Sequence, residues 1–411
     1  MTRGPGRAGS IASEFDRSAA RAAAALSQDG RKPLPPTKSP RTHQRSEFDL
    51  LFAALADAGY EVIGPRVNSG AIELGPIASA AEMPIGITDE QDGGTYRLAD
   101  RGDGALFGFS TGPQSWKRFL HPPVLRLWTS RRDGDGRLQF EDGAEDPPAR
   151  AFLGVRSCDL HAIAALDDAL LNIEHPDDGY RARREASLII ALNCSKAGGT
   201  CFCVSTGTGP RAERGYDLGL TEVIDAGEHY FVIETGSDAG DHLLDSLPTV
   251  GAGEEALAQA ERVIAATAAE MGRELETDGL ADLLKRNLEH PRFDAVSERC
   301  LSCGNCTSVC PTCFCTEVED VVDLAGRTTE HTRRWDSCFT LGFSHVHGGS
   351  VRNSVGSRYR QWMTHKLSTW SDQFESSSGC VGCGRCITWC PVAIDITEEA
   401  AEIRATDGAG L

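Results

Sequence analysis

The sequence has no long apolar run. Its longest uninterrupted apolar stretches, such as LIIAL at 188–192, are far shorter than the ~20 residues that a membrane-spanning helix needs. It also has no apolar signal segment, whereas disulfide frameworks are typical of short secreted chains. For the fifteen cysteines of this 411-residue chain we therefore predict a reducing compartment, with a soluble, cytoplasmic protein that has no membrane span.

Basic charge is scarce beyond the N-terminus. Residues 46–411 carry 32 Lys and Arg against 57 Asp and Glu, and such an acidic body repels a phosphate backbone, which excludes nucleic acid as a partner. Residues 1–45 instead carry nine basic residues against three acidic ones. We predict a disordered basic tail there, with at most one short helix over 14–28. A transit peptide is the alternative, and the acidic residues and the Pro-rich stretch at 31–40 argue against it.

A complete glycine fingerprint for a dinucleotide is also missing. VGAGEE at 250–255 lacks the third glycine and does not clearly follow a strand, so it reads as a linker. We expect no flavin or nicotinamide bound by this chain alone, and the sequence shows no catalytic constellation of its own.

The hydrophobic pattern of the first half is that of an α/β or α+β domain. It predicts a helix over 48–58, a hairpin over 131–140, and strands over 60–67, 71–75 and 95–100. A β-α-β unit follows, with strands over 151–158 and 186–194 around a helix over 159–171, so the two strands should be parallel. Helices are predicted over 254–271 and 278–289. We place a domain boundary near 290, between a domain over 46–290 and a mostly helical dicluster ferredoxin-like domain over 291–411.

The cysteines are concentrated in two copies of one motif, C-x2-C-x2-C-x3-C-P. Three cysteines two residues apart wrap around three corners of a [4Fe–4S] cube, and the fourth, followed by proline, ligates the other cube. The first cluster should therefore be held by Cys300, Cys303, Cys306 and Cys390, and the second by Cys380, Cys383, Cys386 and Cys310. A pair of zinc sites is the alternative, but structural zinc has no use for the third cysteine or the Cys-Pro pair.

Seven cysteines lie outside the motif. Cys158 and Cys194 follow the two predicted parallel strands at one sheet edge, and extended Cys201 and Cys203 should point to one face with Phe202 on the other. These four either hold a third cluster or are small buried hydrophobic residues. Cys313 and Cys315 repeat the TCFC string of 200–203. They either face that copy across the domain interface or form a separate cofactor-binding group with Cys338.

Two further features carry alternatives. His345 and His347 in SHVHGG are either metal ligands or, as we favour, polar residues packed near a cluster. The basic, aromatic stretch at 358–367 is either a solvated helix face or a docking surface for a partner, because arginine and aromatic side chains anchor protein interfaces. We take the docking surface as the hypothesis to test.

These strings together resemble one family. ERCLSCGNCTSVCPTCFC (298–315), GPQSWKRFLHPP (112–123), GVRSCDLHAI (154–163) and GCVGCGRCITWCP (379–391) make the chain similar to the iron–sulfur beta subunit of soluble NADP-linked [NiFe] sulfhydrogenases. They make it equally similar to the A subunit of anaerobic sulfite reductase. The resemblance runs from about residue 46 to the C-terminus, and the eight motif cysteines carry over one by one.

The resemblance implies an electron-transfer subunit of an oxidoreductase complex. Its expected cofactors are two [4Fe–4S] clusters, or three if the N-terminal cysteines bind one. Its expected partners are a flavin subunit that reacts with NAD(P)H and a catalytic subunit, either a hydrogenase or a sulfite reductase. An alternative of another class is a catalytic iron–sulfur subunit with its own substrate-reducing site.

Overall fold

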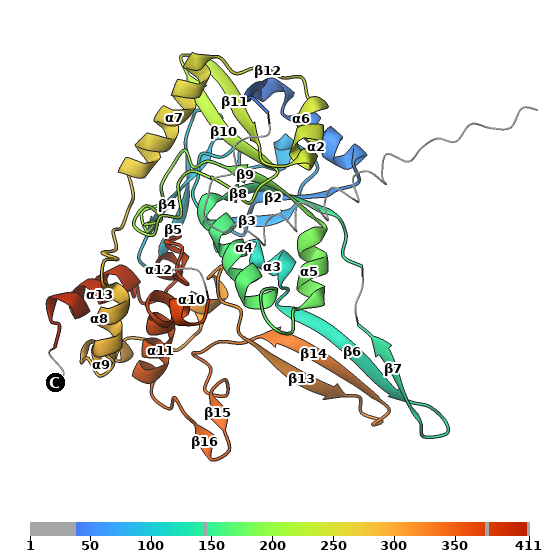
Figure 1. The fold of residues 1–411 in the computed structure, drawn as a ribbon, viewed down its shortest axis with the longest axis vertical. Coiled ribbons are helices and arrows are strands. Elements are labelled where there is room, and N and C mark those ends of the chain that lie inside the picture. The colour runs from blue at the N-terminus through green and yellow to red at the C-terminus, as the bar shows by residue number, and fades with distance from the viewer. Residues whose placement is uncertain (1–37, 144–145, 375–377, 409–411) are drawn as a thin grey trace, which may run out of the picture.

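An eight-stranded mixed sheet forms the centre of the N-terminal part (Figure 1). The computed structural model describes residues 38–143, 146–374 and 378–408. The strand order is β12-β1-β11-β10-β9-β8-β2-β3, in which β2, β8, β9 and β10 are parallel neighbours and the other pairs are antiparallel. The strands are β1 Arg41–Gln44, β2 Glu61–Asn68, β3 Ala71–Pro76, β8 Arg150–Arg156, β9 Ser187–Leu192, β10 Leu218–Asp225, β11 Glu228–Thr235 and β12 Val250–Gly251.

Helices cover both faces of this sheet because its central strands are apolar on both sides. In β9, Leu188 and Ile190 pack with helices α2 and α6, whereas Ile189 and Ala191 pack with α3, α4 and α5 on the opposite face. Helix α7 packs against β10 and β11. The predicted β-α-β unit is confirmed as β8–α4–β9 with parallel strands. The helices are α2 Asp49–Asp57, α3 Lys117–Leu120, α4 Ser157–Leu170, α5 Asp178–Glu185, α6 Asp238–Asp245 and α7 Glu254–Ala269.

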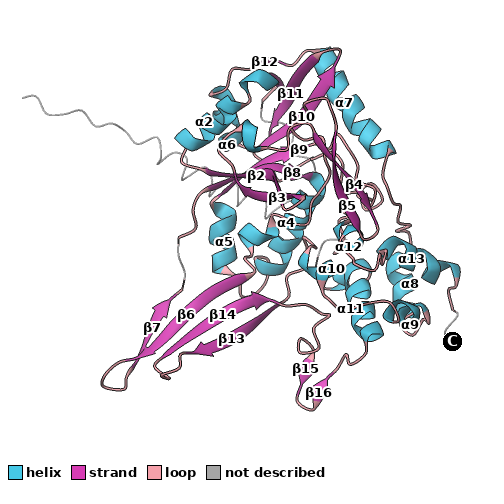
Figure 2. Ribbon diagram, turned by 180° about the vertical axis from the view of Figure 1, so that it is seen from behind, coloured by secondary structure: helices cyan, strands magenta, loops and turns pink. Residues whose placement is uncertain are grey.

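A second, antiparallel sheet is shared by distant parts of the chain and projects from the body (Figures 1 and 2). The predicted hairpin is confirmed as β6 (Val124–Arg132) and β7 (Leu138–Asp142). The sequence did not indicate β13 (Thr316–Val322) and β14 (Thr328–Trp335), and β14 pairs with β6. Strands β4 (Ile87–Asp92) and β5 (Thr95–Asp100) form a separate hairpin.

The C-terminal part is built from short helices around two cysteine loops. They are α8 Leu280–Arg286, α9 Arg292–Ser297, α10 Asn305–Ser308, α11 Val355–Leu367, α12 Arg385–Thr388 and α13 Ile396–Ala405, with 3-10 turns at Arg45–Glu47, Ala80–Glu82 and Thr369–Asp372 along the chain. A small hairpin, β15 (His345–Val346) and β16 (Gly349–Ser350), is added. The leucines of α8 belong to this C-terminal core.

The end of the predicted tail is wrong. Residues 41–44 form strand β1, which pairs with β11 and β12 inside the large sheet. His43 is buried there, with one ring nitrogen 3.0 Å from the Pro248 carbonyl oxygen and the other 3.2 Å from that of Glu47. The helix predicted over 14–28 lies outside the described residues. Of the described helices, none is both long and apolar enough to cross a membrane.

Candidate iron–sulfur centre

Two cysteine loops of the same construction face each other in the C-terminal part. In each loop a glycine, Gly304 or Gly384, has a left-handed φ (+74° and +72°) and begins a one-turn helix, α10 or α12. Glycine adopts this conformation without the penalty that a Cβ would bring. All fifteen cysteines are free thiols, so none of the sulfur is committed to a disulfide.

The thiols predicted for the first cluster share one cavity. Cys300, Cys303, Cys306 and Cys390 all line it, although Cys390 belongs to the other loop. Two backbone N–H groups point at this sulfur, from Ser302 to the Sγ of Cys300 at 3.5 Å and from Ile394 to that of Cys390 at 3.3 Å. Such N–H donors stabilise cluster thiolates, and the arrangement supports the predicted exchange of the fourth ligand.

The thiols predicted for the second cluster are more deeply placed. Burial raises the pKa of Cys386, and the neighbouring thiols of Cys380, Cys383 and Cys310 raise it further. Burial likewise raises the pKa of Cys380 to about 12. Cys380 and Cys386 are therefore poor anions by themselves, so iron is what would make them thiolates. For Cys310, the hydrogen bond with Cys313 and the charge of Lys366 outweigh burial and lower the pKa of the thiol. These four residues therefore fit the chemistry of a ferredoxin-type cluster.

Buried cationic side chains lie close to the cysteines of the second set. Arg385 lies between two of its cysteines and pairs with Asp159 of α4 at 3.0 Å, and both side chains are 3 % exposed. The Nζ of Lys366 donates to the Thr312 hydroxyl at 2.5 Å. Burial lowers the pKa of Lys366, but the thiolates of Cys310 and Cys313 outweigh this and raise it. Positive charge is thus held next to sulfur that must become negative.

The docking hypothesis for 358–367 is wrong. This stretch is most of helix α11, and Arg358, Tyr359, Trp362 and Lys366 are all buried. Arg358 donates to the carbonyl oxygens of Arg352 and Asn353 and to the Ser302 hydroxyl in the first loop. The helix supports the cysteine loops from inside, and of its basic residues only Arg360 and His365 are partly exposed. A basic, aromatic pattern cannot reveal this, because Ser302, which accepts from Arg358, and Thr312, which accepts from Lys366, are distant in sequence.

The four N-terminal cysteines gather beside the second loop. Cys158 and Cys194 follow the parallel strands β8 and β9 as expected, each two residues after the strand ends, and Cys158 lies in the first turn of α4. Cys203 interacts electrostatically with Cys194, Cys201 and Cys383, and Cys158 with Cys383 and Cys203.

The N-terminal TCFC segment also lies directly on the second loop. The backbone N–H of Phe202 donates to the Gly382 carbonyl oxygen at 2.8 Å. A Cβ at Gly382 or Gly384 would stand 2.6 Å or 2.3 Å from the backbone of this segment, so only glycine permits the contact. Phe202 is buried in the C-terminal core, while Cys203 packs with Cys158 in a separate small cluster.

The two TCFC copies have different neighbours. Cys201 and Cys203 adjoin Cys383, whereas Cys313 is hydrogen-bonded to Cys310 and Cys315 interacts with Cys338. His345 and His347 are exposed on the β15–β16 hairpin, so the expectation that they pack near a cluster is wrong. In the described ranges, no group of three or more His, Cys, Asp or Glu side chains converges as ligands of a single metal ion would.

Two positioning residues were missed at the level of sequence. Lys117, in the GPQSWKRFLHPP segment, is 2 % exposed and donates to the Cys313 carbonyl oxygen at 3.0 Å. Asp159 is the buried partner of Arg385. For both residues, the available signal was a charged side chain inside an otherwise apolar or aromatic segment. The sequence could not show their partners, because Cys313 and Arg385 are about 200 residues further along the chain.

Comparison with known proteins agrees with this site. Residues 299–394 match the family model of the 4Fe–4S dicluster domain. Sulfhydrogenase 2 subunit beta of Pyrococcus furiosus is 33% identical over 298 residues, which are 70% of this chain and 84% of that protein. The similarity therefore extends well beyond the cysteine loops and includes much of the N-terminal part. The chain belongs to the family of sulfhydrogenase beta subunits and carries a 4Fe–4S dicluster domain.

Proposed function

We propose that this chain is the electron-transfer subunit of an NAD(P)-linked [NiFe] hydrogenase complex. In this role it relays electrons to or from a flavin subunit that reacts with NAD(P)H. Membership of the sulfhydrogenase beta family supports a hydrogenase partner over a sulfite reductase, because the curated relative carries that name. A [4Fe–4S] cluster, when bound, takes up and releases one electron, and this is the chemistry that the chain's residues would hold in place.

The observation that carries the proposal is the order in which the cysteine sets adjoin one another. Cys203 of the N-terminal set packs in one small cluster with Cys383 of the second set. Cys386 of the second set in turn lines the same cavity as Cys306 of the first. In the first set Cys303 is exposed to solvent, whereas Cys383 of the second set is buried. A continuous series of thiols thus runs from the interior to the surface, as a relay requires.

We propose the ligand sets accordingly. Cys300, Cys303, Cys306 and Cys390 hold the first cluster, and Cys380, Cys383, Cys386 and Cys310 the second. Cys158, Cys194, Cys201 and Cys203 hold a third, supported by their mutual interaction and by their burial against the second loop. The proposed units remain an α/β domain over 46–290 and a dicluster domain over 291–411, and the packing of the α8 leucines adds α8 to the latter.

Reduction by NADPH, with and without the flavin-bearing subunit, tests the relay. The full chain, prepared anaerobically with its clusters, is mixed with NADPH, and cluster reduction is followed by electron paramagnetic resonance. We expect no reduction by NADPH alone and rapid reduction once the flavin subunit is added. Rapid reduction without that subunit would contradict the proposal, as would a cluster signal that shifts when sulfite or another substrate is added, which indicates a catalytic subunit.

A further inference from the structure

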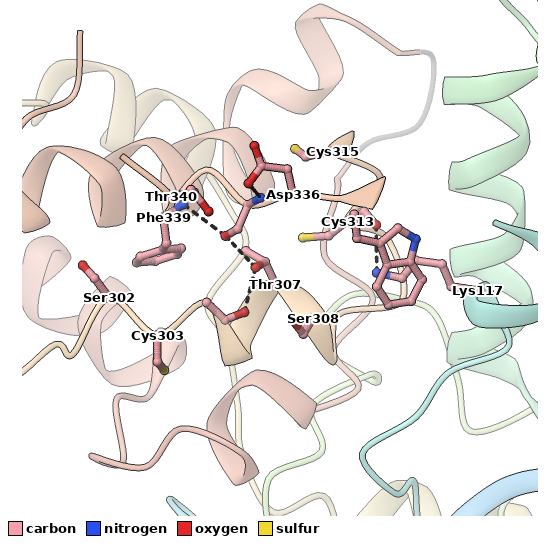
Figure 3. A pocket seen from close by; sticks show the side chains of 13 residues that line it. Lys117, Ser302, Cys303, Thr307, Ser308, Cys313, Cys315, Asp336, Phe339 and Thr340 are labelled. Atoms are coloured by element: carbon pink, nitrogen blue, oxygen red, sulfur yellow. Dashed lines mark hydrogen bonds between the residues drawn. The ribbon is translucent and has the colours of Figure 1, made fainter. Parts of the chain in front are cut away.

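A cavity of about 220 Å³ lies outside the ligand sets proposed above (Figure 3). It is bounded by the first cysteine loop, the second TCFC segment, the end of β14 and Lys117 of α3. Cys313, Cys315 and Cys303 all line it, and the sulfur of Cys303 points away from those of Cys313 and Cys315 (Figure 3). Cys338 is next to Ser337 and Phe339 of the cavity wall and interacts with Cys315.

Lys117 is a buried cation without a carboxylate partner. Its side chain is 2 % exposed, and its Nζ lies 3.8 Å from the centroid of the Trp335 ring and donates only to a carbonyl oxygen. Among the described residues no ion pair joins Lys117 to an Asp or Glu. Lys366, 4 % exposed, is in the same position. A buried charge is costly unless an opposite charge compensates it.

The anions available to these two lysines are cysteine sulfurs. Lys117 interacts with Cys313, Cys310 and Cys315. Lys366 interacts with these and also with Cys338 and Cys380. The second cluster employs Cys310 and Cys380 of this group, and a neutral thiol at Cys313, Cys315 or Cys338 supplies no compensating charge. Thiolates bound to iron do supply it.

We propose that Cys313, Cys315 and Cys338 bind an iron–sulfur cluster of their own beside this cavity, with Lys117 and Lys366 as its buried counter-ions. The proposal rests on the function proposed above, since Cys310 is assigned to the second cluster. Three thiolates suit either a three-iron cluster or a cube with one corner free of cysteine. With the eight motif cysteines and the N-terminal four, this site accounts for all fifteen cysteines of the chain.

Cysteine substitution tests the site directly. Cys315→Ser and Cys338→Ser are compared with Thr340→Ala, a matched control that removes an exposed side chain from the same cavity wall but no thiol. In the full, anaerobically prepared chain, each cysteine variant should contain about three or four fewer irons than the control. The resonance signals of the two dicluster clusters should remain. Equal iron in both variants and the control would overturn the proposal.

A second pair of variants decides the matter if the cysteine variants do not fold. Lys117→Met removes the charge with little change of volume, and Lys117→Arg keeps it. One cluster signal, distinct from the two dicluster signals, should shift to a lower reduction potential in the Met variant but not in the Arg variant. The same potentials in both variants overturn the proposal. If the wild type lacks even the two dicluster signals, the function proposed above fails instead.

Discussion

At the scale of single residues, the exchange of the fourth cysteine is the most specific expectation. Cys310 directly follows the first loop in sequence, yet it interacts with Cys380, Cys383 and Cys386 of the second loop. Cys390 makes the reverse exchange and lines the cavity of the first set. The exchange itself stays a prediction, and its basis is the motif spacing, which already carries the direction of the fourth side chain.

We predict that Cys310→Ala removes the second cluster and leaves the first. Iron content should fall by about four per chain, because one cube loses a ligand. Electron paramagnetic resonance should still show the cluster of the Cys300–Cys306 loop. The matching variant Cys390→Ala should give the opposite result. Loss of the first cluster from Cys310→Ala would show that each loop binds its own cube.

His121 is a second residue with a consequence that can be measured. It is 1 % exposed, and neither ring nitrogen has a hydrogen-bond partner among the described residues. Burial, followed by the positive charges of Arg333 and Lys117, lowers its pKa from 6.5 to about 3. The unfolded chain therefore takes up a proton below pH 6.5 that the folded chain refuses, and folding stability falls as the pH falls.

The expected loss of the free energy of unfolding is about 1.4 kcal/mol per pH unit once the pH is below 6.5. We predict that the free energy of unfolding of His121→Phe, measured by chemical denaturation, falls less steeply than that of the wild type between pH 7.5 and 5.5. This range is kept narrow to protect the clusters. His347→Phe, which changes an exposed histidine, serves as the control and should follow the wild type. Parallel declines in all three proteins would contradict the assignment.

At the scale of secondary structure elements, the sequence could predict the strands that have a clear pattern of apolar residues and could not predict those without one. Strands β8 and β9 were found because FLGV and LIIAL are continuous apolar runs buried on both faces. Strand β1, RTHQ, has no such run and is held by pairing with β11 and by burial of His43. Strand β13, TEVEDVV, is exposed along most of its length, so alternation carries little signal there.

The arm formed by β6, β7, β13 and β14 ties the two cysteine regions together. Its central pair joins β6 of the N-terminal part to β14 of the C-terminal part, and Trp128 stacks on His331 across it. Arg333 of β14 is also paired with Asp177 before α5. A boundary in sequence near 290 could not foresee this, because pairing between distant strands leaves no local pattern.

We predict that residues 291–411 expressed alone hold little iron. This fragment lacks strand β6, the buried Phe202 and the α8 leucines of its own core. It should be digested by protease faster than the full chain and bind fewer than the about eight irons of two cubes. A fragment that begins at residue 271 restores α8 and should be intermediate. Full cluster signals from the shorter fragment would mean that the dicluster domain folds independently.

At the scale of the whole molecule, the cysteine sets differ in how they are covered. Cys303 and Leu301 of the first loop are exposed, with Leu301 at 62 %. The second loop lies under the N-terminal TCFC segment and is joined to α4 through the Arg385–Asp159 pair. The positive charge of Lys366 and Arg385 is likewise on the buried side. A partner's cofactor can therefore approach the first set far more closely than the second.

We predict that the first cluster is lost before the second when the full chain is treated with a chelator or with ferricyanide. A chelator or oxidant must reach the iron or sulfur of a cluster in order to attack it. Cys303 of the first set is exposed, so the reagent can reach that cluster, whereas Cys383 of the second set is buried. Electron paramagnetic resonance spectra taken at intervals should lose the signal of the first cluster, which is the signal that Cys310→Ala retains. They should keep the signal of the second cluster, which Cys310→Ala removes. Phe202→Ala, which thins the cover of the second loop, should narrow the difference in rate. Loss of both signals at the same rate in the wild type would mean that the two clusters are equally accessible to the reagent. The first cluster would then not be the exposed end of the relay.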